Sequence, residues 1–197
     1  NAMINSEESS NPKFILLLTT LTSFMTAFMG SSLNIALPVI GNDFHASAKT
    51  LSWLSTIYLL TTASLLLPIG KLADIKGRKN FFKFGLIIFT TGSFFCGISQ
   101  DTIQLMISRS IQGIGSSFLF ATSTAILVSA FPQNRRGYVL GINTAAVYTG
   151  LSSGPFLGGL ITQSINWRMI FFLNSIIGVI LILTTIKTLL EKNISAE

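Results

Sequence analysis

The sequence has little charge and almost no cysteine or histidine. Charged residues make up 10% of its 197 positions, whereas soluble domains carry roughly 25%. Cys96 is the single cysteine and His45 the single histidine. The chain is therefore not a disulfide-stabilised secreted scaffold, and it offers no ligand set for a zinc site. A chain this poor in charge lacks most of the polar surface that a water-soluble fold needs.

The signatures of enzymes are missing as well. The sequence has no Ser/His/Asp grouping, no pair of carboxylates within an apolar run and no phosphate-binding loop, because the glycines of residues 150–159 follow no predicted strand and lack a Lys-Ser/Thr ending. We expect no enzyme activity, no cofactor and no metal. Disorder is excluded too, because the chain contains 16 Phe together with abundant Leu and Ile.

What the sequence does contain is a series of long apolar runs between short polar stretches. Each run approaches the ~20 residues that span a bilayer as a helix, and a helix satisfies its own backbone hydrogen bonds in lipid. No polar face recurs along these runs, as a soluble helical core would require. We predict an all-α membrane protein with six transmembrane helices, at residues 14–37, 50–71, 80–99, 102–130, 137–163 and 168–190.

These helices form one predicted bundle at residues 13–190. Residues 1–12 comprise the Asn-Ala remnant of an expression tag and a polar tail, and residues 191–197 begin a linker. Ten of the thirteen Lys and Arg residues fall in tails and loops on one side of the predicted membrane. The positive-inside rule makes that side the cytoplasm, with both termini in it. Loop residues that fix topology account for the net charge of +6 without a nucleic-acid partner.

The strongest motif lies between the second and third predicted helices, where residues 70–79 have the sequence GKLADIKGRK. Gly70 and Gly77 suit a tight turn. Asp74 is placed either to cap the next helix or to accept a hydrogen bond from Arg78. An ordinary basic loop would explain the lysines and arginines, but not two glycines and an aspartate at these spacings.

This segment resembles the loop between helices two and three of the major facilitator superfamily. It matches the family pattern at Gly70, Leu72, Ala73, Asp74, Gly77, Arg78 and Lys79. The resemblance implies that the chain is one half, the N-terminal bundle, of a transporter whose two six-helix halves surround a central cavity. It also implies that Asp74 is a conformational latch, which contacts a helix of the other half and helps to hold the outward-facing state.

A second motif lies in the fifth predicted helix, where residues 150–159 have the sequence GLSSGPFLGG. Gly150, Gly154 and Gly158 share one helix face and would let a neighbouring helix approach closely, and Pro155 should bend the helix. With Gly159, these positions resemble the G-x-x-x-G-P-x-x-G-G pattern of antiporters in the same superfamily, which implies export. A plain packing face remains an equal alternative as the sole role of these glycines.

A third motif places an arginine inside the fourth predicted helix. Arg109, Gln112 and Gly113 resemble the R-x-x-Q-G-x-G motif of drug:proton antiporters, which implies that Arg109 assists proton transfer or substrate binding. An arginine within a membrane helix is costly, and it normally faces a cavity or a partner. The alternative is that Arg109 snorkels, because it lies only seven or eight residues into its helix.

Residues 34–38, NIALP, resemble the end of helix one in the fourteen-helix drug:proton antiporter group. By itself Pro38 predicts a helix end, and Trp53 and Trp167 are expected to be interfacial anchors. Met29 stands where that group often has an acid. We expect all seven acids of the chain in tails or loops, so no membrane-embedded carboxylate is available to carry a proton.

Together these features predict the N-terminal half of a secondary transporter of the cytoplasmic membrane of a prokaryote. It would be a multidrug-type exporter that uses a proton gradient, works by alternating access and acts on a small amphipathic substrate. Further candidates for its cavity are polar groups in apolar helices: Asn34, Tyr58, Asn143 and Tyr148. The alternative is a natively short six-helix protein that self-assembles without transport. For the isolated chain, without a second half, we expect Arg109 and Gln112 to face lipid. We therefore expect it to form dimers or larger assemblies that bury this face between copies.

Overall fold

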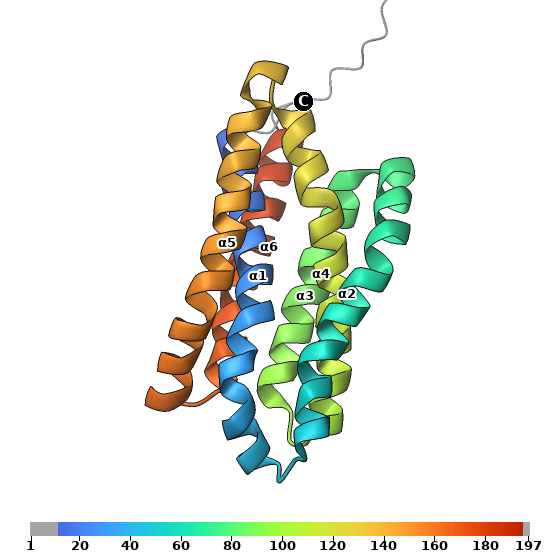
Figure 1. Ribbon diagram of the computed structural model, residues 1–197. Helices are drawn as coiled ribbons and strands as arrows, with labels where there is room; N and C mark the ends of the chain where they lie inside the picture. Colours follow the sequence, from blue (N-terminus) through green and yellow to red (C-terminus); the bar gives the residue numbers. More distant parts are fainter. Residues whose placement is uncertain (1–11, 195–197) are drawn as a thin grey trace, which may run out of the picture.

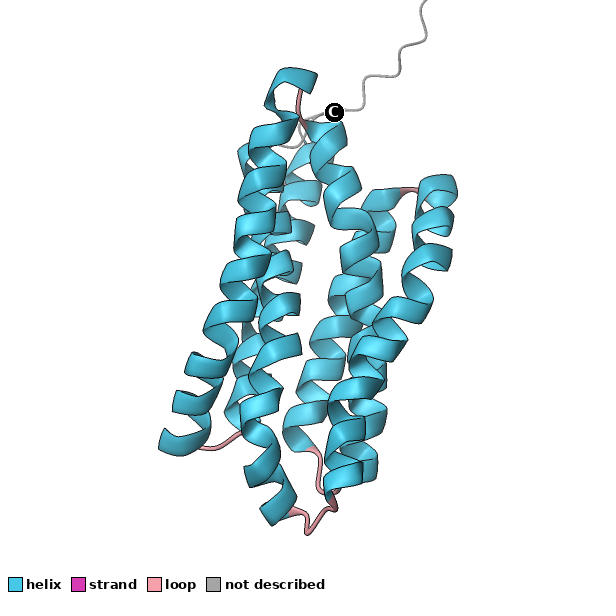
Figure 2. Cartoon of the chain, viewed as in Figure 1, coloured by secondary structure: helices cyan, strands magenta, loops and turns pink. Residues whose placement is uncertain are grey.

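The computed structural model describes the backbone of residues 12–194 and the side chains of residues 12–186. This part of the chain is a bundle of six helices without a strand (Figures 1 and 2). The helices are α1 (Pro12–Asp43), α2 (Ala48–Lys76), α3 (Arg78–Ile98), α4 (Thr102–Ala130), α5 (Gln133–Ser164) and α6 (Arg168–Ile194). The prediction of six helices is confirmed.

The predicted boundaries of the helical bundle can be compared with the structure at each end of the chain. The tag remnant and most of the polar tail, residues 1–11, lie outside the described residues. At the other end, α6 runs to Ile194, so the first residues of the predicted linker at 191–197 belong to the helix. The apolar run ends near residue 186, but the helix continues because no Gly or Pro follows to stop it.

Proline does not end α1, contrary to the prediction. The helix continues through Pro38 to Asp43, and Pro68 and Pro155 likewise lie inside α2 and α5. A proline removes one backbone donor and so frees a carbonyl oxygen in the preceding turn. In a membrane bundle, neighbouring helices and hydroxyl side chains satisfy the freed backbone groups, so the helix can continue. The chain therefore turns later than the sequence pattern indicates, in the short segment around His45 (φ 50).

Short caps set the other helix boundaries. Ser47 accepts a hydrogen bond from the Thr50 amide at 3.3 Å and begins α2, and Asp101 accepts one from the Gln104 amide at 2.8 Å and begins α4. Both are side-chain N-caps, which satisfy an otherwise free amide of the first turn. Gly77 alone joins α2 to α3, with a φ of 103° that side-chain-bearing residues rarely adopt.

The helices pack in a fixed pattern of neighbours. α1 lies along α5, and α4 lies between α2 and α3, with α6 behind, against α3 (Figure 1). The buried core runs through the bundle, and its largest apolar members include Trp167, Phe89, Phe171, Met29 and Leu86. Leu, Phe and Met side chains of this kind fill the space between helices and fix their spacing.

Five of the six helices are long and apolar enough to cross a membrane: α1, α2, α3, α4 and the part of α6 at Arg168–Ile186. α5 is as long as α1, but it contains six glycines and several hydroxyl and amide residues, which make it less apolar. It lies alongside α1 over its length (Figure 1). The chain is an integral membrane protein, in contact with the lipid bilayer through its apolar surface.

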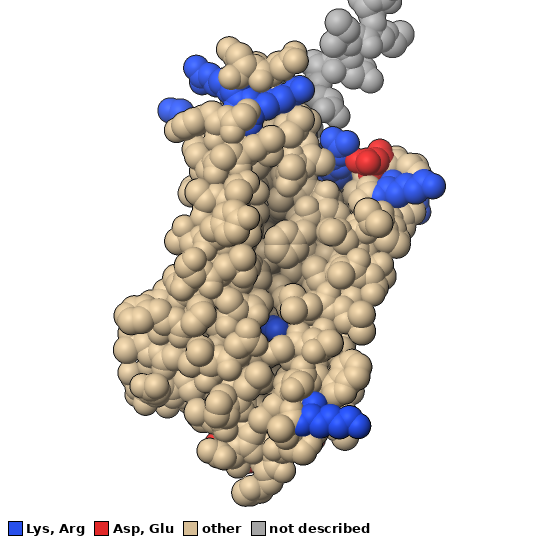
Figure 3. All heavy atoms as spheres, viewed as in Figure 1, with Lys and Arg blue, Asp and Glu red and all other residues tan. Residues whose placement is uncertain are grey.

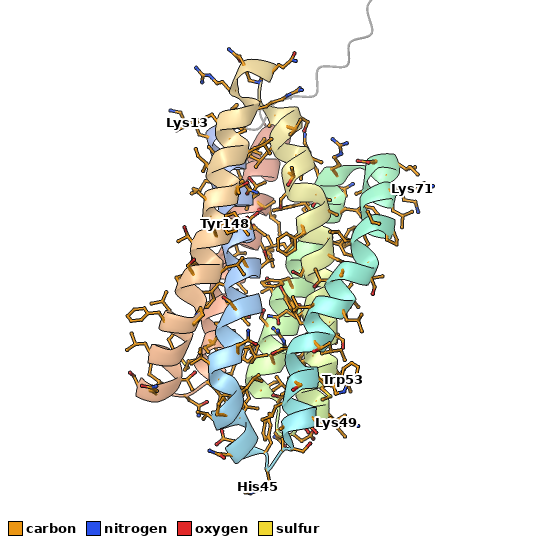
Figure 4. The ribbon with its side chains drawn as sticks, in the orientation of Figure 1. Lys13, His45, Lys49, Trp53, Lys71 and Tyr148 are labelled. Carbon is orange, nitrogen blue, oxygen red and sulfur yellow. The ribbon has the colours of Figure 1, made fainter. Side chains whose placement is uncertain are left out.

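Most charged side chains gather at the two ends of the bundle, and a single basic group is visible between them (Figure 3). Lys13 and Lys71 lie at one end, and His45, Lys49 and Trp53 lie at the other (Figure 4). We call the first the basic end, because it carries the cluster of basic residues at the junction of α2 and α3. This separation of charge from the apolar middle matches the order of polar loops and apolar runs in the sequence.

Candidate functional site

A buried polar cluster surrounds Arg109, about two turns into α4. Its members come from three helices: Arg109, Gln112 and Ser116 from α4, Tyr58 from α2 and Ser93 from α3. We call this set the Arg109 network. All but Tyr58, which is 2% exposed, are completely buried. A polar group buried in an apolar bundle is costly unless it is hydrogen-bonded, so the bonds within the network decide its stability.

Two glycines bring the neighbouring helices close to α4 at this level. A Cβ on Gly113 would lie 2.8 Å from the Tyr58 carbonyl oxygen of α2, and a Cβ on Gly115 would lie 2.6 Å from the Phe89 Cα of α3. The two residues point to opposite sides of α4, so each admits a different helix. Gly113, a coupling candidate in the sequence, thus has a packing role. Its carbonyl oxygen also accepts a hydrogen bond from Thr62 Oγ1 at 3.2 Å.

Arg109 is held by neutral groups on two helices. Its Nη1 donates to Gln112 Oε1 at 2.7 Å, and its Nε donates to the Leu54 carbonyl oxygen at 3.5 Å. The guanidinium carbon lies 4.2 Å from the centroid of the Tyr58 ring, within the range of a cation–π interaction. The arginine therefore links α4 to α2 without a carboxylate.

The rest of the network extends these links to α3 and α1. Gln112 Nε2 donates to Ser93 Oγ at 2.7 Å, so Gln112 connects the arginine to α3. Tyr58 Oη lies 2.7 Å from Ser116 Oγ and donates to the Thr26 carbonyl oxygen of α1 at 3.1 Å. Hydrogen bonds in a low-dielectric interior strengthen one another. The arrangement can hold a cation at a fixed place in the interior of the bundle. Its hydrogen bonds connect that cation to four helices, α1, α2, α3 and α4.

No carboxylate takes part in the network or lies in the membrane interior among residues 12–186. The acids of that range stand at the ends of helices: Asp43 is the last residue of α1, Asp74 lies in the last turn of α2 and Asp101 caps α4. Placing Asp74 in a loop was wrong by a few residues, because α2 continues to Lys76. The expectation that no acid lies deep in the membrane agrees with the described part of the chain.

Arg109 does not snorkel, and it does not face lipid. Its side chain and that of Gln112 are completely buried within this one bundle, so the expectation that they would be exposed is wrong. The physical reason is the close approach of α2 and α3 to α4 at Gly113 and Gly115, which encloses both polar side chains and supplies their partners.

The four further cavity candidates divide into two pairs. Tyr58 and Asn143 are buried, at 2% and 7% exposure; Tyr58 belongs to the Arg109 network, and Asn143 Oδ1 has no hydrogen-bond partner in the described part of the chain. Asn34 and Tyr148 are exposed. Asn34 accepts a hydrogen bond from Ser55 Oγ at 2.9 Å, which joins α1 to α2. Only the exposed pair is available to a second half of a transporter.

Residues 70–79 lie mostly in helices and not in a loop. Gly70 and Leu72 belong to α2, and a Cβ on Gly70 would make an ordinary contact with Ala121, 3.8 Å away. Gly70 is thus not part of a turn, and Gly77 alone makes it. Asp74 Oδ1 accepts a hydrogen bond from Arg78 Nε at 2.7 Å in an ion pair across the turn, with both side chains partly exposed. Lys79 follows in the first turn of α3 and is exposed.

The glycines of α5 face α1. A Cβ on Gly150 would lie 2.6 Å from the Phe24 carbonyl oxygen, one on Gly158 would lie 2.9 Å from that of Ser32, and one on Gly154 would collide with Ser31 Oγ. Gly159 lies against Ile35, and Pro155 is exposed on another face. Ser31 Oγ also donates to the Gly150 carbonyl oxygen at 3.3 Å. These contacts confirm a close helix–helix interface.

A second polar cluster, at the end opposite the basic end, was not predicted. Trp167 Nε1 donates to Asp43 Oδ2 at 2.7 Å, and Arg168 Nη2 donates to the Ser99 carbonyl oxygen at 3.0 Å. Arg168 also lies 3.8 Å from Asp43 and stacks over Trp167, with Cζ 4.3 Å from the ring. Trp167 is completely buried, so its prediction as an interfacial anchor was wrong. Trp53 is exposed, as an anchor requires.

Sequence reasoning missed the partners more than the central residues. Ser93 and Ser116 complete the Arg109 network, but a serine in a membrane helix usually bonds to its own backbone, as Ser93 also does with the Phe89 carbonyl oxygen at 2.8 Å. The sequence therefore gives no signal that separates them from other serines. Asp43 and Arg168 gave a signal, as opposite charges at two helix ends on one side of the membrane, but their 125-residue separation hides the pairing.

The comparison with known families decides the classification. The profile of the Major Facilitator Superfamily matches residues 19–195, which include α2 to α6 and all but the first seven residues of α1. The chain belongs to the major facilitator superfamily. This is a family of membrane transporters and not of enzymes, and both earlier expectations are confirmed.

Several relatives carry names that specify transport. The chain is 39% identical over 175 residues to the riboflavin transporter RibZ of Clostridioides difficile. This match covers 89% of this chain and 38% of the relative. It is 39% identical over 173 residues to multidrug resistance protein 3 of Bacillus subtilis, a match that covers 87% of this chain and 33% of the relative. It is 35% identical to multidrug transporter protein MdtP of the same organism, a match that covers 90% of this chain and 33% of the relative. The chain thus spans about a third of the length of these relatives.

A solved structure has the same fold. A bacterial homologue of the human lysosomal transporter Spinster, in an inward-facing and unoccupied conformation, matches with a TM-score of 0.75 and 22% sequence identity. The match covers 90% of this chain and 43% of the other. The six-helix bundle is therefore an arrangement that a transporter of this family uses as part of a larger molecule.

Proposed function

We propose that this chain is the N-terminal half of a secondary transporter that exports amphipathic, drug-like compounds by alternating access. The observation that carries the proposal is the complete burial of Arg109 in the membrane interior. An ionisable side chain there is expensive and marks a functional site by default. It is retained here together with a full set of neutral partners, which hold the guanidinium in one position.

The antiporter-type features support export and the fourteen-helix drug:proton antiporter group. The glycines of α5 match the antiporter pattern, and residues 34–38 match the group's first helix. Two of the relatives are named as multidrug proteins. We infer that the driving ion is the proton. Because residues 12–186 hold no carboxylate in the membrane interior, the group that binds the proton belongs to the second half, and Arg109 acts on substrate or on that carboxylate by its charge.

Asp74 is proposed to be the latch between the two halves at the basic end. Its carboxylate is partly exposed, and Arg78 occupies one of its oxygens from the next helix. The other oxygen is available to a group of the second half, such as the amides at a helix N-terminus. By the positive-inside rule the basic end is cytoplasmic, with both termini on that side. Closure of the latch would hold the cytoplasmic side shut.

The alternative is a short membrane protein that self-assembles without transport, and the structure removes one reason for such self-assembly. The self-association expected of an isolated chain depended on polar side chains of α4 exposed to lipid, but Arg109 and Gln112 are buried. The exposed surface of the bundle is mostly apolar, with side chains such as Leu67, Phe156 and Leu183. Such a surface needs only lipid to cover it and gives no polar driving force for pairing.

Uptake of ethidium, a cationic amphipathic dye, into everted membrane vesicles that contain the full-length protein tests the proposal. We expect uptake during respiration that a protonophore abolishes. Arg109→Ala should remove uptake, and Asp74→Asn should slow it, whereas Ser110→Ala should leave it unchanged, because Ser110 bonds only to the Met106 carbonyl oxygen of its own helix. Uptake no faster than in vesicles without the protein would contradict export of this class of compound.

A further inference from the structure

A groove of about 450 Å³ opens between α3 and α6 near the basic end of the bundle. Its size falls within the range of small-molecule pockets. Most of its lining is apolar, and its polar members stand at one end or on the floor: Asn80, Lys83, Phe84, Leu86, Ile87, Ile182, Thr185 and Ile186. None of these residues belongs to the Arg109 network or to the helix faces joined by the α5 glycines.

The groove has a closed end toward the middle of the membrane. A Cβ on Gly178 of α6 would lie 2.9 Å from Thr90 Cγ2 of α3, and Ser175 Oγ donates to the Thr90 carbonyl oxygen at 3.4 Å. The two helices therefore touch at this level. From Thr90 to Lys83 the axis of α3 rises by roughly 10 Å. Over that stretch Leu86, whose side chain is buried, forms part of the floor of the groove.

The walls of the groove face the lipid tails. Phe84 and Ile87 of α3 are exposed, and so is Ile186 of α6, at 59%, 45% and 45%. They belong to the membrane-spanning parts of their helices. An acyl chain entering between them would stay in contact with apolar surface and would replace bulk lipid contacts by closer ones.

The open end carries a positive charge, that of Lys83. Lys83 is half-buried, so its stem lies along the groove, and no acidic side chain pairs with it within residues 12–186. The amide of Asn80 lies one turn earlier on the same helix. Asp74, which stands at the junction of α2 and α3, is already paired with Arg78. Lys71, Lys76 and Lys79, which lie at the same end, add to the positive potential.

We propose that this groove binds an anionic phospholipid of the surrounding membrane. The phosphate accepts hydrogen bonds from the Lys83 ammonium and the Asn80 amide, and one acyl chain lies in the apolar part between α3 and α6. Basic pockets between membrane helices bind anionic headgroups in this way. Charge at one end and an apolar slot toward the membrane centre match the two parts of a phospholipid, whereas a helix of a partner protein, 10–12 Å wide, would bring no phosphate to Lys83.

Native mass spectrometry of the full-length protein, titrated with phosphatidylglycerol and phosphatidylcholine of identical acyl chains, tests the proposal. We expect tighter binding of phosphatidylglycerol. Lys83→Gln should weaken that binding by about fivefold, as expected for the loss of one cation at an anionic headgroup. Lys83→Arg should retain it. Lys49→Gln is the matched control, because Lys49 is an exposed lysine at the opposite end of the bundle, and it should change nothing.

A second variant tests the acyl part of the site separately. Ile87→Trp leaves Lys83 in place and fills the groove from an exposed wall position, so it should also weaken phosphatidylglycerol binding while the melting temperature stays near that of the wild type. Equal affinity of the wild type for the two lipids, or undiminished phosphatidylglycerol binding by Lys83→Gln, would overturn the proposal. Undiminished binding by a correctly folded Ile87→Trp variant would overturn the placement of the acyl chain.

Discussion

Arg109 shows how a single residue is stabilised in an apolar interior without an opposite charge. Its partners are an amide oxygen, a backbone carbonyl oxygen and the face of a tyrosine ring. Such groups offset part of the cost of burial, but they do not cancel the charge. The guanidinium therefore keeps an electrostatic influence over its surroundings that a salt bridge would remove. This makes it suited to act on a charged group that enters the transporter from outside this bundle.

The first prediction concerns that side chain. In the full-length protein, Arg109→Ala should abolish efflux and should lower stability by about 1–3 kcal/mol, because Gln112 Oε1 and the Leu54 carbonyl oxygen lose their donor. Arg109→Lys should restore only part of the transport, because an ammonium cannot reproduce the planar fork. Dye efflux from cells and melting in detergent measure the two effects. Efflux by the alanine variant at the wild-type rate would show that the buried cation has no part in transport.

Asp43 has a different kind of role, as the acceptor for a buried indole. Asp43→Ala should destabilise the protein by about 2 kcal/mol, because Trp167 Nε1 would be left without an acceptor at a fully buried position. Asp43→Asn should cost less than about 1 kcal/mol, since the amide oxygen can still accept while only the partly exposed ion pair with Arg168 is lost. Thermal unfolding followed by circular dichroism compares the two. Equal destabilisation by both variants would assign the effect to the ion pair instead.

At the scale of the helices, glycine positions decide which elements touch. Gly113 and Gly115 bring α2 and α3 to α4, and the α5 glycines bring α5 to α1. The sequence predicted the α5 face correctly, because three glycines at a spacing of four mark one side of a helix. It did not predict the partner, α1, because spacing along one helix contains no information about its neighbour. The same limit hid the partners of Gln112 and Trp167.

The helix boundaries follow the same logic. The predicted start of the fourth helix at residue 102 was correct, because Asp101 caps it. The turn expected at Gly77 is present, but the predicted start of the next helix at residue 80 was two residues late. The predicted ends were wrong at Pro38, where the local rule that proline stops a helix was overridden by the bundle, and near residue 71, where the lysines indicated a loop. Charged residues mark the edge of the membrane, but a helix can extend beyond that edge into water.

The α5 glycines give the prediction at this scale. Gly158→Ala should destabilise the protein by about 1–3 kcal/mol, because its Cβ would lie 2.9 Å from both the Cβ and the carbonyl oxygen of Ser32. Gly141→Ala is the matched control on the same helix, where nothing lies within 4 Å of a new Cβ, and it should be neutral or stabilising by up to about 1 kcal/mol. Melting curves of the two variants provide the comparison. If both melt as the wild type does, α1 and α5 are not held together as closely as the structure has them.

At the scale of the whole molecule, the distribution of charge is the feature that the sequence specifies best. The basic residues of the α2–α3 junction, with Arg135 and Arg136 in the first turn of α5, contrast with a few charges at the other end (Figure 3). This contrast predicts orientation without any knowledge of how the helices pack. The packing itself, including which polar residues are enclosed and which are exposed, required the contacts between helices far apart in the chain.

Labelling of single cysteines from each side of the membrane tests this orientation. The background is Cys96→Ala, which removes the one native thiol, itself completely buried. His45→Cys should react in intact cells with a maleimide that cannot cross the membrane, because His45 lies in the exposed turn opposite the basic end (Figure 4). Arg135→Cys, an exposed position in the first turn of α5, should react only after the membrane is opened. One arginine is removed from that side, but the remaining basic residues keep the bias that sets the topology. The reverse labelling pattern would place the basic end outside and, with it, move the Asp74 latch to the opposite gate.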